Sequence, residues 1–432
     1  MKNKKYLNIA IVGLGNIGLN LYKHLLINKE SIKKKTNVNL VVKYVSAKNK
    51  LKKRKISIPK KKWLKNYLEA SRIKDIDLVV ELIGGSEGAA KKLVFNSIKN
   101  KKHVVTANKS LISKHGNELA KLAEKNKINL EFEAAVGGGI PIIRVIKEAL
   151  ITNKIDKIYG ILNGTSNFIL SQMSETNLNF NDVLNNAKKL GYAEANPKSD
   201  LNGDDAKSKI QILSSLAFNS FIIKSDISVE GIERVDQVDI LNAKILGYKI
   251  KHLAIAEIKN NKLIQRVHPC MVKENSYISN INGVLNAVII EGYPIGKFTI
   301  QGEGAGPGPT TSALISDICS ILRGNIKLPF SISNKNRKKI KSIDISEEFF
   351  SSYIRLDVID KTGVLSSITK ILSKNKISVK RLIQNPFKSK KFSSIIIISH
   401  KAKNLNLTKS ISELSNKKFV INTPKFFRIE EI

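Results

Sequence analysis

The chain has 432 residues, of which 42% are hydrophobic, and 74 Lys and Arg against 36 Asp and Glu give it a formal net charge of +38. This length and composition fit two to four globular domains, and no apolar run approaches the roughly 20 residues of a membrane span. The charge suggests nucleic-acid binding, but most basic residues are Lys, and they are spread along the chain without gathering in one aromatic-interleaved patch. We therefore expect neither a nucleic-acid partner nor a membrane partner.

The cysteine and histidine residues indicate which cellular compartment and which metal sites to expect. Cys270 and Cys319 have no second pair and no metal-ligand spacing, and the six histidines have no His or Cys partners. The apolar run at residues 9–12 leads into glycines, so it predicts a strand and a turn and not a signal peptide. We expect free thiols in a reducing cytoplasm and no zinc site.

The first predicted element is a buried strand at residues 7–12. The segment 13–18, Gly-Leu-Gly-Asn-Ile-Gly, follows at once, and a helix is predicted over residues 19–27. Between a strand and a helix, G-x-G-x-x-G is typical of dinucleotide binding, because its glycines allow the tight turn, the approach of a pyrophosphate and close helix packing. The helix N-terminus then faces the phosphates. The predicted cofactor contacts are Gly13, Gly15, Asn16, Ile17 and Gly18.

The second predicted strand, residues 39–45, bears on the choice of cofactor. Sites that prefer NAD place an acidic residue near the end of this strand, where it binds the ribose hydroxyls. Ser46, Lys48 and Lys50 stand there instead. A lysine suits an additional 2′-phosphate, so we expect NADP, with NAD as the alternative in a chain this rich in lysine.

Two further strands, at residues 77–83 and 103–109, end in glycine-rich or polar turns. In doubly wound sheets, ligands bind beyond the carboxyl ends of the strands. Gly84, Thr106 and Lys109 are therefore expected on the cofactor side, with a solvated surface lysine as the alternative for Lys109.

A fifth strand is predicted at residues 128–136, followed by the loop 137–141, Gly-Gly-Gly-Ile-Pro. Glu133 beside this loop either holds a monovalent cation or orders the turn. A strand at residues 157–162 is expected to begin a second domain. The turn after it, at residues 163–167, offers backbone and hydroxyl donors to a substrate carboxylate.

Residues 191–209 concentrate charged side chains in a chain where carboxylates are scarce: Glu194, Asp200, Asp204, Asp205, Lys207 and Lys209. Asp205 and Lys209 are four residues apart, so on the helix predicted from about Asp204 they share one face. The stretch is either a capped surface loop or a site, and its residues alone do not decide.

The last third of the chain is predicted to contain a second glycine-rich loop and a separate module. The loop, residues 301–310, opens a helix over residues 311–322 that we expect to return to the first domain. A polar linker follows. Strands at residues 353–359, 393–399 and 418–421, with a helix starting at residues 360–365, then form a small β/α module apart from the catalytic body.

Six segments, in chain order, resemble homoserine dehydrogenases over nearly the full length. They are residues 13–18, residues 104–109 (Val-Val-Thr-Ala-Asn-Lys), residues 132–141 (Phe-Glu-Ala-Ala-Val-Gly-Gly-Gly-Ile-Pro), residues 160–167 (Gly-Ile-Leu-Asn-Gly-Thr-Ser-Asn), residues 191–194 (Gly-Tyr-Ala-Glu) and residues 200–206 (Asp-Leu-Asn-Gly-Asp-Asp-Ala). The final module, with Asp-Lys-Thr-Gly-Val-Leu at residues 360–365, is similar to an ACT domain. The combination is far more specific than any one motif.

The resemblance implies an α/β chain with a linker between its second and third domains. The expected parts are a Rossmann-type NAD(P)-binding domain at residues 1–135, an α+β catalytic and dimerisation domain at residues 136–325, a linker at residues 326–350 and a ferredoxin-like ACT domain at residues 351–427. It further implies NAD(P)H-dependent reversible reduction of L-aspartate 4-semialdehyde to L-homoserine, in threonine, methionine and isoleucine biosynthesis. A homo-oligomer (dimer or tetramer) and threonine as an effector at the ACT domain are implied as well.

The resemblance also assigns roles to residues of this chain. The implied catalytic residues are Lys209, Lys109 and Asp205, and which lysine gives the proton stays open. Glu194 is expected to hold the substrate amino group, Asp200 to shape the crevice, and Gly164 and Thr165 to receive the carboxylate. Gly306 matches a cofactor contact. Glu133, with the carbonyls of Val136, Gly138 and Ile140, matches a site for Na+ or K+.

Two positions depart from the family pattern. Asn196 stands where the family has Asp, beside the inferred site, and Thr362 replaces the usual Pro of the ACT first turn, which leaves the ligand of that module less defined. The alternatives are another NADP-dependent amino-acid oxidoreductase and a non-catalytic amino-acid sensor of the same fold. The presence of all the charged site residues disfavours the sensor.

Overall fold

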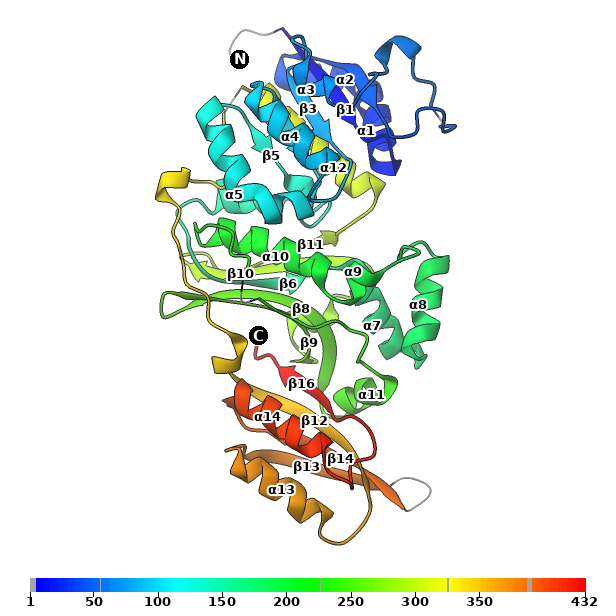
Figure 1. The fold of residues 1–432 in the computed structure, drawn as a ribbon, viewed down its shortest axis with the longest axis vertical. Coiled ribbons are helices and arrows are strands. Elements are labelled where there is room, and N and C mark those ends of the chain that lie inside the picture. The colour runs from blue at the N-terminus through cyan, green and yellow to red at the C-terminus, as the bar shows by residue number, and fades with distance from the viewer. Residues whose placement is uncertain (1–4, 55, 226, 325, 387–390) are drawn as a thin grey trace.

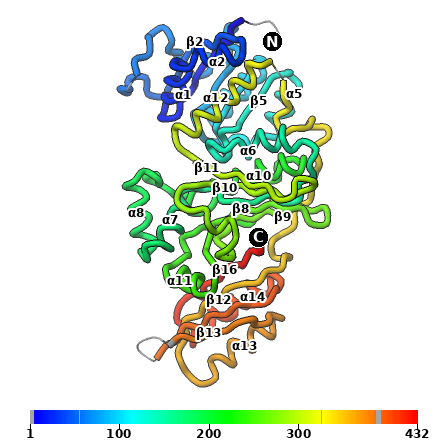
Figure 2. Tube along the Cα trace, turned by 180° about the vertical axis from the view of Figure 1, so that it is seen from behind, coloured from blue at the N-terminus to red at the C-terminus, as the bar shows by residue number. Residues whose placement is uncertain are grey.

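The computed structural model describes residues 5–54, 56–225, 227–324, 326–386 and 391–432. Along the longest axis of the molecule lie an N-terminal doubly wound part, a middle part built on a large sheet, and a C-terminal module (Figures 1 and 2). The described residues include no helix both long and apolar enough to span a bilayer.

The N-terminal part is a five-stranded parallel sheet in the order β2-β1-β3-β4-β5. Its strands are β1 (Tyr6–Val12), β2 (Asn39–Ser46), β3 (Leu78–Glu81), β4 (His103–Thr106) and β5 (Leu130–Glu131). The strand order reverses beside β1, and in such sheets the crevice at the carboxyl ends at this point receives the ligand. The predicted first strand and its glycine turn are thus confirmed, and they open onto that crevice.

Helices cover both faces of this sheet (Figure 1). They are α1 (Asn16–Ile27), α2 (Lys29–Thr36), α3 (Glu69–Arg72), α4 (Ala89–Lys99), α5 (Lys109–Asn126) and, from far along the chain, α12 (Pro307–Leu322). Helix α12 packs its buried face, including Leu314, Ile318 and Ile321, into the same core as β1 and α1. The predicted return of this helix to the first part is confirmed.

The middle part begins a mixed sheet that continues through the rest of the molecule in the order β11-β10-β6-β8-β9-β16-β12-β14-β13. Its own strands are β6 (Lys154–Ile161), β7 (Ile227–Val229), β8 (Tyr248–Lys259), β9 (Lys262–Lys273), β10 (Leu285–Tyr293) and β11 (Gly296–Glu303). Its helices are α6 (Ile142–Arg144), α7 (Gly164–Thr176), α8 (Phe180–Lys189), α9 (Lys198–Leu201), α10 (Asp204–Ala217) and α11 (Gln237–Ile245). Helix α10 contacts α5 on one side and strands β6, β8 and β9 on the other, so one core joins the first two parts.

The C-terminal module has the order βαββαβ, which is that of ferredoxin-like folds. Its elements are β12 (Phe349–Ile359), α13 (Val364–Lys374), β13 (Val379–Pro386), β14 (Phe392–Ser399), the short β15 (Ala402–Lys403), α14 (Asn404–Ser415) and β16 (Lys425–Ile429). Strand β16 pairs with β12 on one side and, in parallel, with β9 of the middle part on the other. The expectation that this module is separate from the catalytic body is therefore wrong, because the two share one sheet.

Buried ion pairs hold the module at this junction. The Arg266 guanidinium binds Glu257 at 2.7 Å and both oxygens of Glu430 at 2.7 and 2.8 Å, and His268 lies 3.0 Å from Glu430. Arg428 binds Glu230 at 2.6 Å. Burial acts against each charge, but the opposite charges win, so the pKa of Glu430 lies well below its usual range. Two parts of the chain thus depend on one another for the neutralisation of the buried Arg266, Arg428 and Glu430.

The expected linker is also bound to the body. The Arg337 guanidinium is buried, donates to the Ser220 carbonyl and to Ser215 Oγ at 2.8 Å, and lies 4.1 Å from the centre of the Phe330 ring. Backbone bonds add to this, for example from Leu263 N–H to the Lys341 carbonyl. Strand β12 starts within the range expected for the linker, and β16 ends beyond residue 427.

Two predicted strands differ from the structure. The fifth strand extends only over β5, because Phe132 leaves the extended conformation and a 3-10 turn, Glu133–Ala135, follows. The Glu133 N–H binds Asp317 at 2.9 Å in this turn. The strand predicted at residues 418–421 is wrong: Val420 makes one isolated bridge, and the strand that completes the sheet is β16.

We expect Glu430→Ala to destabilise the whole protein by about 3–5 kcal/mol, because the change leaves the buried Arg266 with one carboxylate in place of two. Urea unfolding followed by circular dichroism measures the change. Glu413→Ala is the matched control, since Glu413 pairs with Lys374 on the surface of the same module. Equal unfolding midpoints for the two variants would contradict the proposed contribution of the Glu430 ion pairs to stability.

Candidate active site

A cleft of about 650 Å³ lies where the N-terminal and middle parts meet. The N-termini of α5, α7 and α10 all point toward it, together with the loop at residues 190–194 and the second glycine-rich loop. Most of the predicted site residues line it: Lys109, Gly138, Gly164, Thr165, Glu194, Asp200, Asp205, Lys209, Gly306 and Ile17. Segments as far apart in the sequence as Ile17 and Gly306 thus converge here.

Asp205 is the central group of the cleft. Its side chain is 4% exposed, and Lys109 Nζ lies 2.8 Å from one oxygen while Lys209 Nζ lies 2.7 Å from the other. Lys209 is one helical turn beyond Asp205 on α10, as predicted from their spacing, and its ammonium also donates to the Leu162 carbonyl at 2.6 Å. Lys209 therefore uses two of its three N–H donors within the protein, and the third remains for a ligand.

The two lysines that share Asp205 differ in their proton affinity. Burial lowers the pKa of Lys209, with the nearby Lys109 adding to the effect, and Asp205 only partly opposes it. Lys109 has 40% of its side chain exposed, and although burial acts to lower its pKa, Asp205, Asp200 and Glu194 raise it overall. Burial would raise the pKa of Asp205, but the two ammonium groups hold it well below its usual range. Lys209 is thus the lysine better able to exchange a proton.

Asn163 connects the two aspartates of the cleft. Its amide nitrogen donates to Asp200 at 2.8 Å and to Asp205 at 2.9 Å, while its oxygen caps α7 by accepting from Ser166 N–H. Sequence reasoning identified the turn that contains Asn163 but not this role. The available signal was an Asn at the predicted helix start, since its side chain has two donors left after capping.

The N-terminus of α7 presents Gly164 and Thr165 to the cleft. A side chain at Gly164 would place its Cβ 2.7 Å from the Val284 carbonyl oxygen, so only glycine fits this approach. The Thr165 hydroxyl is already engaged, donating to the Tyr192 carbonyl at 2.8 Å and lying 3.2 Å from Asp200. The backbone N–H groups at this helix start, and not the hydroxyl, are therefore the donors suited to an anion. Glu194 is exposed and lines the same cleft.

The glycine turn after β1 has the geometry that a dinucleotide requires. Gly13 has a φ of 109°, and an added Cβ would lie 2.3 Å from the Leu82 carbonyl oxygen, while a Cβ on Gly18 would lie 2.0 Å from the Gly13 carbonyl oxygen. Gly15 faces open space at the start of α1, where Asn16 and Ile17 are the first residues. A second cleft, of about 710 Å³, extends from this turn along the end of β2.

The remaining predicted cofactor contacts have different surroundings. Gly84 is exposed in the turn after β3, with a φ of 85°. Gly306 starts α12 at the edge of the first cleft. Thr106 is fully buried and donates to Glu81 at 2.6 Å, and Glu81 in turn accepts from Gly84 N–H. Thr106 lines neither cleft, so in this structure it orders the turns around the crevice.

Glu133, predicted at a cation site, lies under the N-terminus of α6. Its two oxygens accept from the backbone N–H groups of Ile143 and Arg144 at 2.9 and 2.8 Å. Burial raises its pKa to about 7 in spite of these bonds. The Ile140 carbonyl accepts from Ile142 N–H. Among the described residues, no group of three or more His, Cys, Asp or Glu side chains is arranged to bind a metal.

Comparison with known proteins adds the decisive observation. The family model described as "Homoserine dehydrogenase" matches residues 141–319, and "Homoserine dehydrogenase, NAD binding domain" matches residues 13–133. Homoserine dehydrogenases of Neisseria gonorrhoeae and Helicobacter pylori are each 38% identical to this chain, the first over 95% of both chains and the second over 99% of this chain and 100% of its own. The crystal structure of a homoserine dehydrogenase from Thiobacillus denitrificans superposes with a TM-score of 0.92 at 35% identity, covering 99% of each chain.

The chain belongs to the homoserine dehydrogenase family. It is an oxidoreductase with homoserine dehydrogenase activity, and its N-terminal Rossmann-like domain binds a nicotinamide cofactor. The expected homoserine dehydrogenase identity is confirmed. The expected NAD(P)-binding domain and α/β catalytic part are confirmed as well. Asp205 and Lys209 lie within the region that the first family model matches, and Lys109 lies within the region that the second one matches.

We expect Asn163→Ala to lower kcat/KM for homoserine by about 10- to 100-fold, because the buried Asp205 and the half-buried Asp200 each lose one hydrogen bond. The affinity for the dinucleotide, measured by fluorescence titration, should not change, since Asn163 does not line the second cleft. Asn202→Ala is the control: this amide binds the exposed Asp204 beside the site. An Asn163→Ala enzyme with normal kcat/KM would remove Asn163 from the site.

Proposed function

We propose that the enzyme interconverts L-homoserine and L-aspartate 4-semialdehyde with NADP as the preferred cofactor, at the cleft around Asp205. The observation that carries this proposal is the pairing of one buried carboxylate with two ammonium groups beside the glycine turn. A hydride transfer to or from a hydroxyl carbon needs a group that takes or gives the hydroxyl proton, and Lys209 is placed for it.

An amino-acid substrate needs partners for both of its charges. We assign the substrate ammonium to Glu194 and its carboxylate to the N–H groups of Gly164 and Thr165, where the positive end of the α7 dipole favours an anion. Asp200 accepts hydrogen bonds from Asn163 and Thr165 and so borders the proposed carboxylate site at the start of α7. The side chain of the substrate then extends toward Lys209 and Lys109.

Lys209 Nζ is the group to which we assign the proton of the reacting hydroxyl. Burial lowers the pKa of Lys209, which makes its neutral amine, the form that accepts this proton, easier to reach. Asp205 holds the resulting ammonium by an ion pair, and Lys109 adds positive charge where an alkoxide would develop. The nicotinamide ring, when bound, supplies the hydride donor or acceptor.

The preference for NADP rests on the second cleft. Among the described residues that line it are Lys48, Lys50, Lys52, Arg54 and Lys65, and no Asp or Glu. Ser46 stands at the end of β2, and its carbonyl accepts from Gly13 N–H. A 2′-phosphate entering here would meet positive charge, whereas the ribose hydroxyls of NAD would lack a carboxylate partner.

We also propose the monovalent cation site at Glu133 with the carbonyls of Val136, Gly138 and Ile140. The fit is chemical: a buried carboxylate retains lone pairs after accepting two N–H bonds, and backbone oxygens suit a hard cation. A bound Na+ or K+ would relieve the cost of burying an ionised Glu133. Because these residues order the loop under the cleft, the cation would stabilise the site without touching the substrate.

The C-terminal βαββαβ module is proposed to be an ACT domain that binds threonine as a feedback effector, for an enzyme of threonine, methionine and isoleucine biosynthesis. Its contact with the catalytic part through β16 supports a route for regulation. We further propose that the enzyme is a homo-oligomer (dimer or tetramer) and that it is located in the reducing cytoplasm. The two free cysteines, Cys270 and Cys319, are consistent with the latter.

We expect purified enzyme to reduce NADP in the presence of L-homoserine, with a lower KM for NADP than for NAD. We expect added L-threonine to slow this reaction.

Lys209→Met should lower kcat by about 10²- to 10⁴-fold, the usual contribution of a general acid or base. The rate is followed by absorbance of the reduced cofactor at alkaline pH. Lys207→Met, a half-buried lysine of the same helix outside the cleft, is the control. No turnover with either cofactor would refute the proposed function, and a normal kcat for Lys209→Met would refute the role of Lys209.

K+ is expected to raise the melting temperature above pH 7, relative to tetramethylammonium at equal ionic strength, and to have no effect at pH 5. Because burial raises the pKa of Glu133 to about 7, the folded protein binds its proton more tightly than the unfolded chain, so this group stabilises at low pH and loses that contribution as pH rises to 7. A cation replaces the proton and stabilises by mass action. Glu133→Gln should abolish the difference between the salts, and a persistent difference would refute the site.

A further inference from the structure

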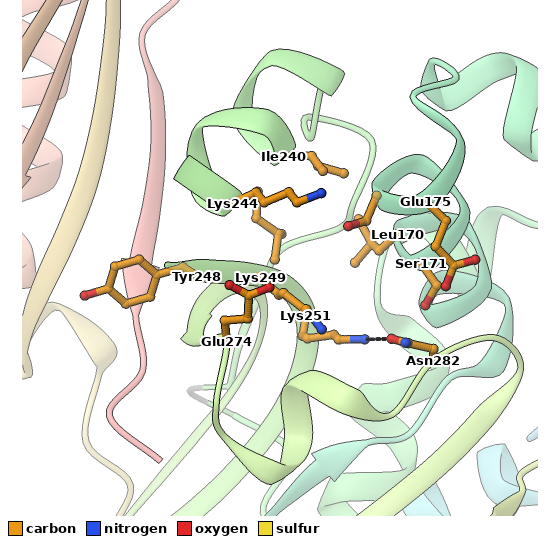
Figure 3. A pocket seen from close by; sticks show the side chains of 12 residues that line it. Leu170, Ser171, Glu175, Ile240, Lys244, Tyr248, Lys249, Lys251, Glu274 and Asn282 are labelled. Carbon is orange, nitrogen blue, oxygen red and sulfur yellow. Dashed lines mark hydrogen bonds between the residues drawn. The ribbon is translucent and has the colours of Figure 1, made fainter. Parts of the chain in front are cut away.

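Lys251 on β8 is a buried cation that does not line the cleft around Asp205. The residue is 2% exposed, and its ammonium donates to the Ile281 carbonyl at 2.7 Å, to Asn282 Oδ1 at 2.9 Å and to Asn167 Oδ1 at 3.5 Å (Figure 3 shows the bond to Asn282). All three acceptors are neutral oxygens. Among the described residues, no carboxylate lies within ion-pair distance of this ammonium.

A buried ammonium with no carboxylate partner destabilises the folded protein, so the presence of a lysine at this position needs an explanation. An ammonium without a carboxylate partner keeps its full desolvation cost, and burial lowers the pKa of Lys251 to about 7, with Lys249 contributing. A methionine of similar length would fill the same space without that cost. What a lysine supplies here, and a methionine does not, is hydrogen-bond donors, two of them directed at one loop and the third at Asn167 of α7.

That loop, residues 281–285, is held from its other side by α7. The Asn167 amide donates to the carbonyls of Ile281, Gly283 and Leu285 at 3.0–3.1 Å, and Gly283 N–H donates to Ser171 Oγ at 3.2 Å. Asn167 also accepts from Lys251. Lys251, Asn167 and the loop therefore form one hydrogen-bonded unit, in which the position of each member depends on the others.

The loop reaches the cleft through Val284. Val284 is one of the residues that line the cleft, and its carbonyl lies so close to Gly164 that a Cβ there would be 2.7 Å away. Two residues on, Asn286 packs against Gly304 of the second glycine-rich loop, where an added Cβ would lie 2.0 Å from its amide nitrogen. A shift of the loop would thus move the N-terminus of α7, whereas Asn286 is held in strand β10, which pairs with β6 and β11, and keeps the cofactor side in place.

We propose that Lys251 is a positioning residue for substrate recognition: it fixes the loop 281–285, and through Val284 it sets the α7 N–H groups that receive the substrate carboxylate. The proposal rests on the proposed function of the Asp205 cleft. Lys251 itself touches neither substrate nor cofactor in this scheme.

A cavity of about 330 Å³ gives experimental access to this residue. It is lined by α7, α11 and the start of β8, and Lys251 lies at its base with Ser171 and Asn282 beside it (Figure 3). Lys249, Lys244, Glu175 and Glu274 are the other charged groups around it. A small amine could enter from this side and reach the space that a shortened Lys251 would leave.

The test compares Lys251→Ala with Lys249→Ala in the full-length enzyme. Lys249 lies two residues away on the same strand, and its ammonium makes an exposed bond of 3.2 Å to Asn280. Lys251→Ala is expected to raise KM for homoserine by about 10- to 100-fold, with the affinity for NADP unchanged, because the loop loses its hydrogen bonds to Lys251. Lys249→Ala should leave both values near those of the wild type.

Chemical rescue separates positioning from a general loss of stability. Propylammonium chloride, which carries the atoms deleted from Lys251, should restore KM for homoserine in Lys251→Ala, and tetramethylammonium chloride at the same concentration should not. A wild-type enzyme without homoserine turnover would refute the proposed function itself. With an active wild type, a normal KM in Lys251→Ala, a parallel loss of NADP affinity, or rescue of the melting temperature without rescue of KM would each overturn the positioning role.

Discussion

The site depends on one buried carboxylate shared by two ammonium groups. Asp205 comes from the start of α10, Lys109 from the start of α5 in the N-terminal part, and the Asn163 amide from the start of α7. If the carboxylate were absent, two cations would face one another without a counter-charge between them, and the two parts of the enzyme would repel where they now attract. The electrostatic demand of Asp205 therefore fixes the relative position of three helix N-termini, and with it the geometry available for chemistry.

Local patterns in the sequence predicted much of this arrangement. The glycine turn after β1 is recognisable because Gly13 and Gly18 approach backbone atoms that exclude any side chain. The Asp205–Lys209 pair follows from helical periodicity alone, and the structure confirms it at 2.7 Å. The roles proposed for Glu194 and Asp200 came from the family resemblance, and the structure adds to them only their places on the wall of the cleft.

What the sequence could not reveal is mostly non-local. Asn163 binds two carboxylates about 40 residues away, and no spacing rule relates them. Lys251 looks like any of the many lysines until its three neutral acceptors are seen. The strand predicted at residues 418–421 failed for a related reason: several apolar segments near this end could extend, and the choice of β16 depends on its long-range partners, β9 and β12. Pairings of this kind are set by the assembled sheet and leave no periodic trace.

The central place of β16 has a consequence for the order in which the protein can assemble. Arg428 pairs with Cys270 in the parallel ladder, more than 150 residues away in sequence, while the rest of the module is built from near neighbours. Contacts this distant are formed late, because the entropy of closing the long intervening segment must be overcome first. The middle sheet would therefore leave Cys270 and Met271 of β9 without their partner strand, and Arg266 and His268 without Glu430, until the module docks. An enzyme arranged in this way acquires a continuous sheet, neutralised charges and its completed C-terminal module in a single late event.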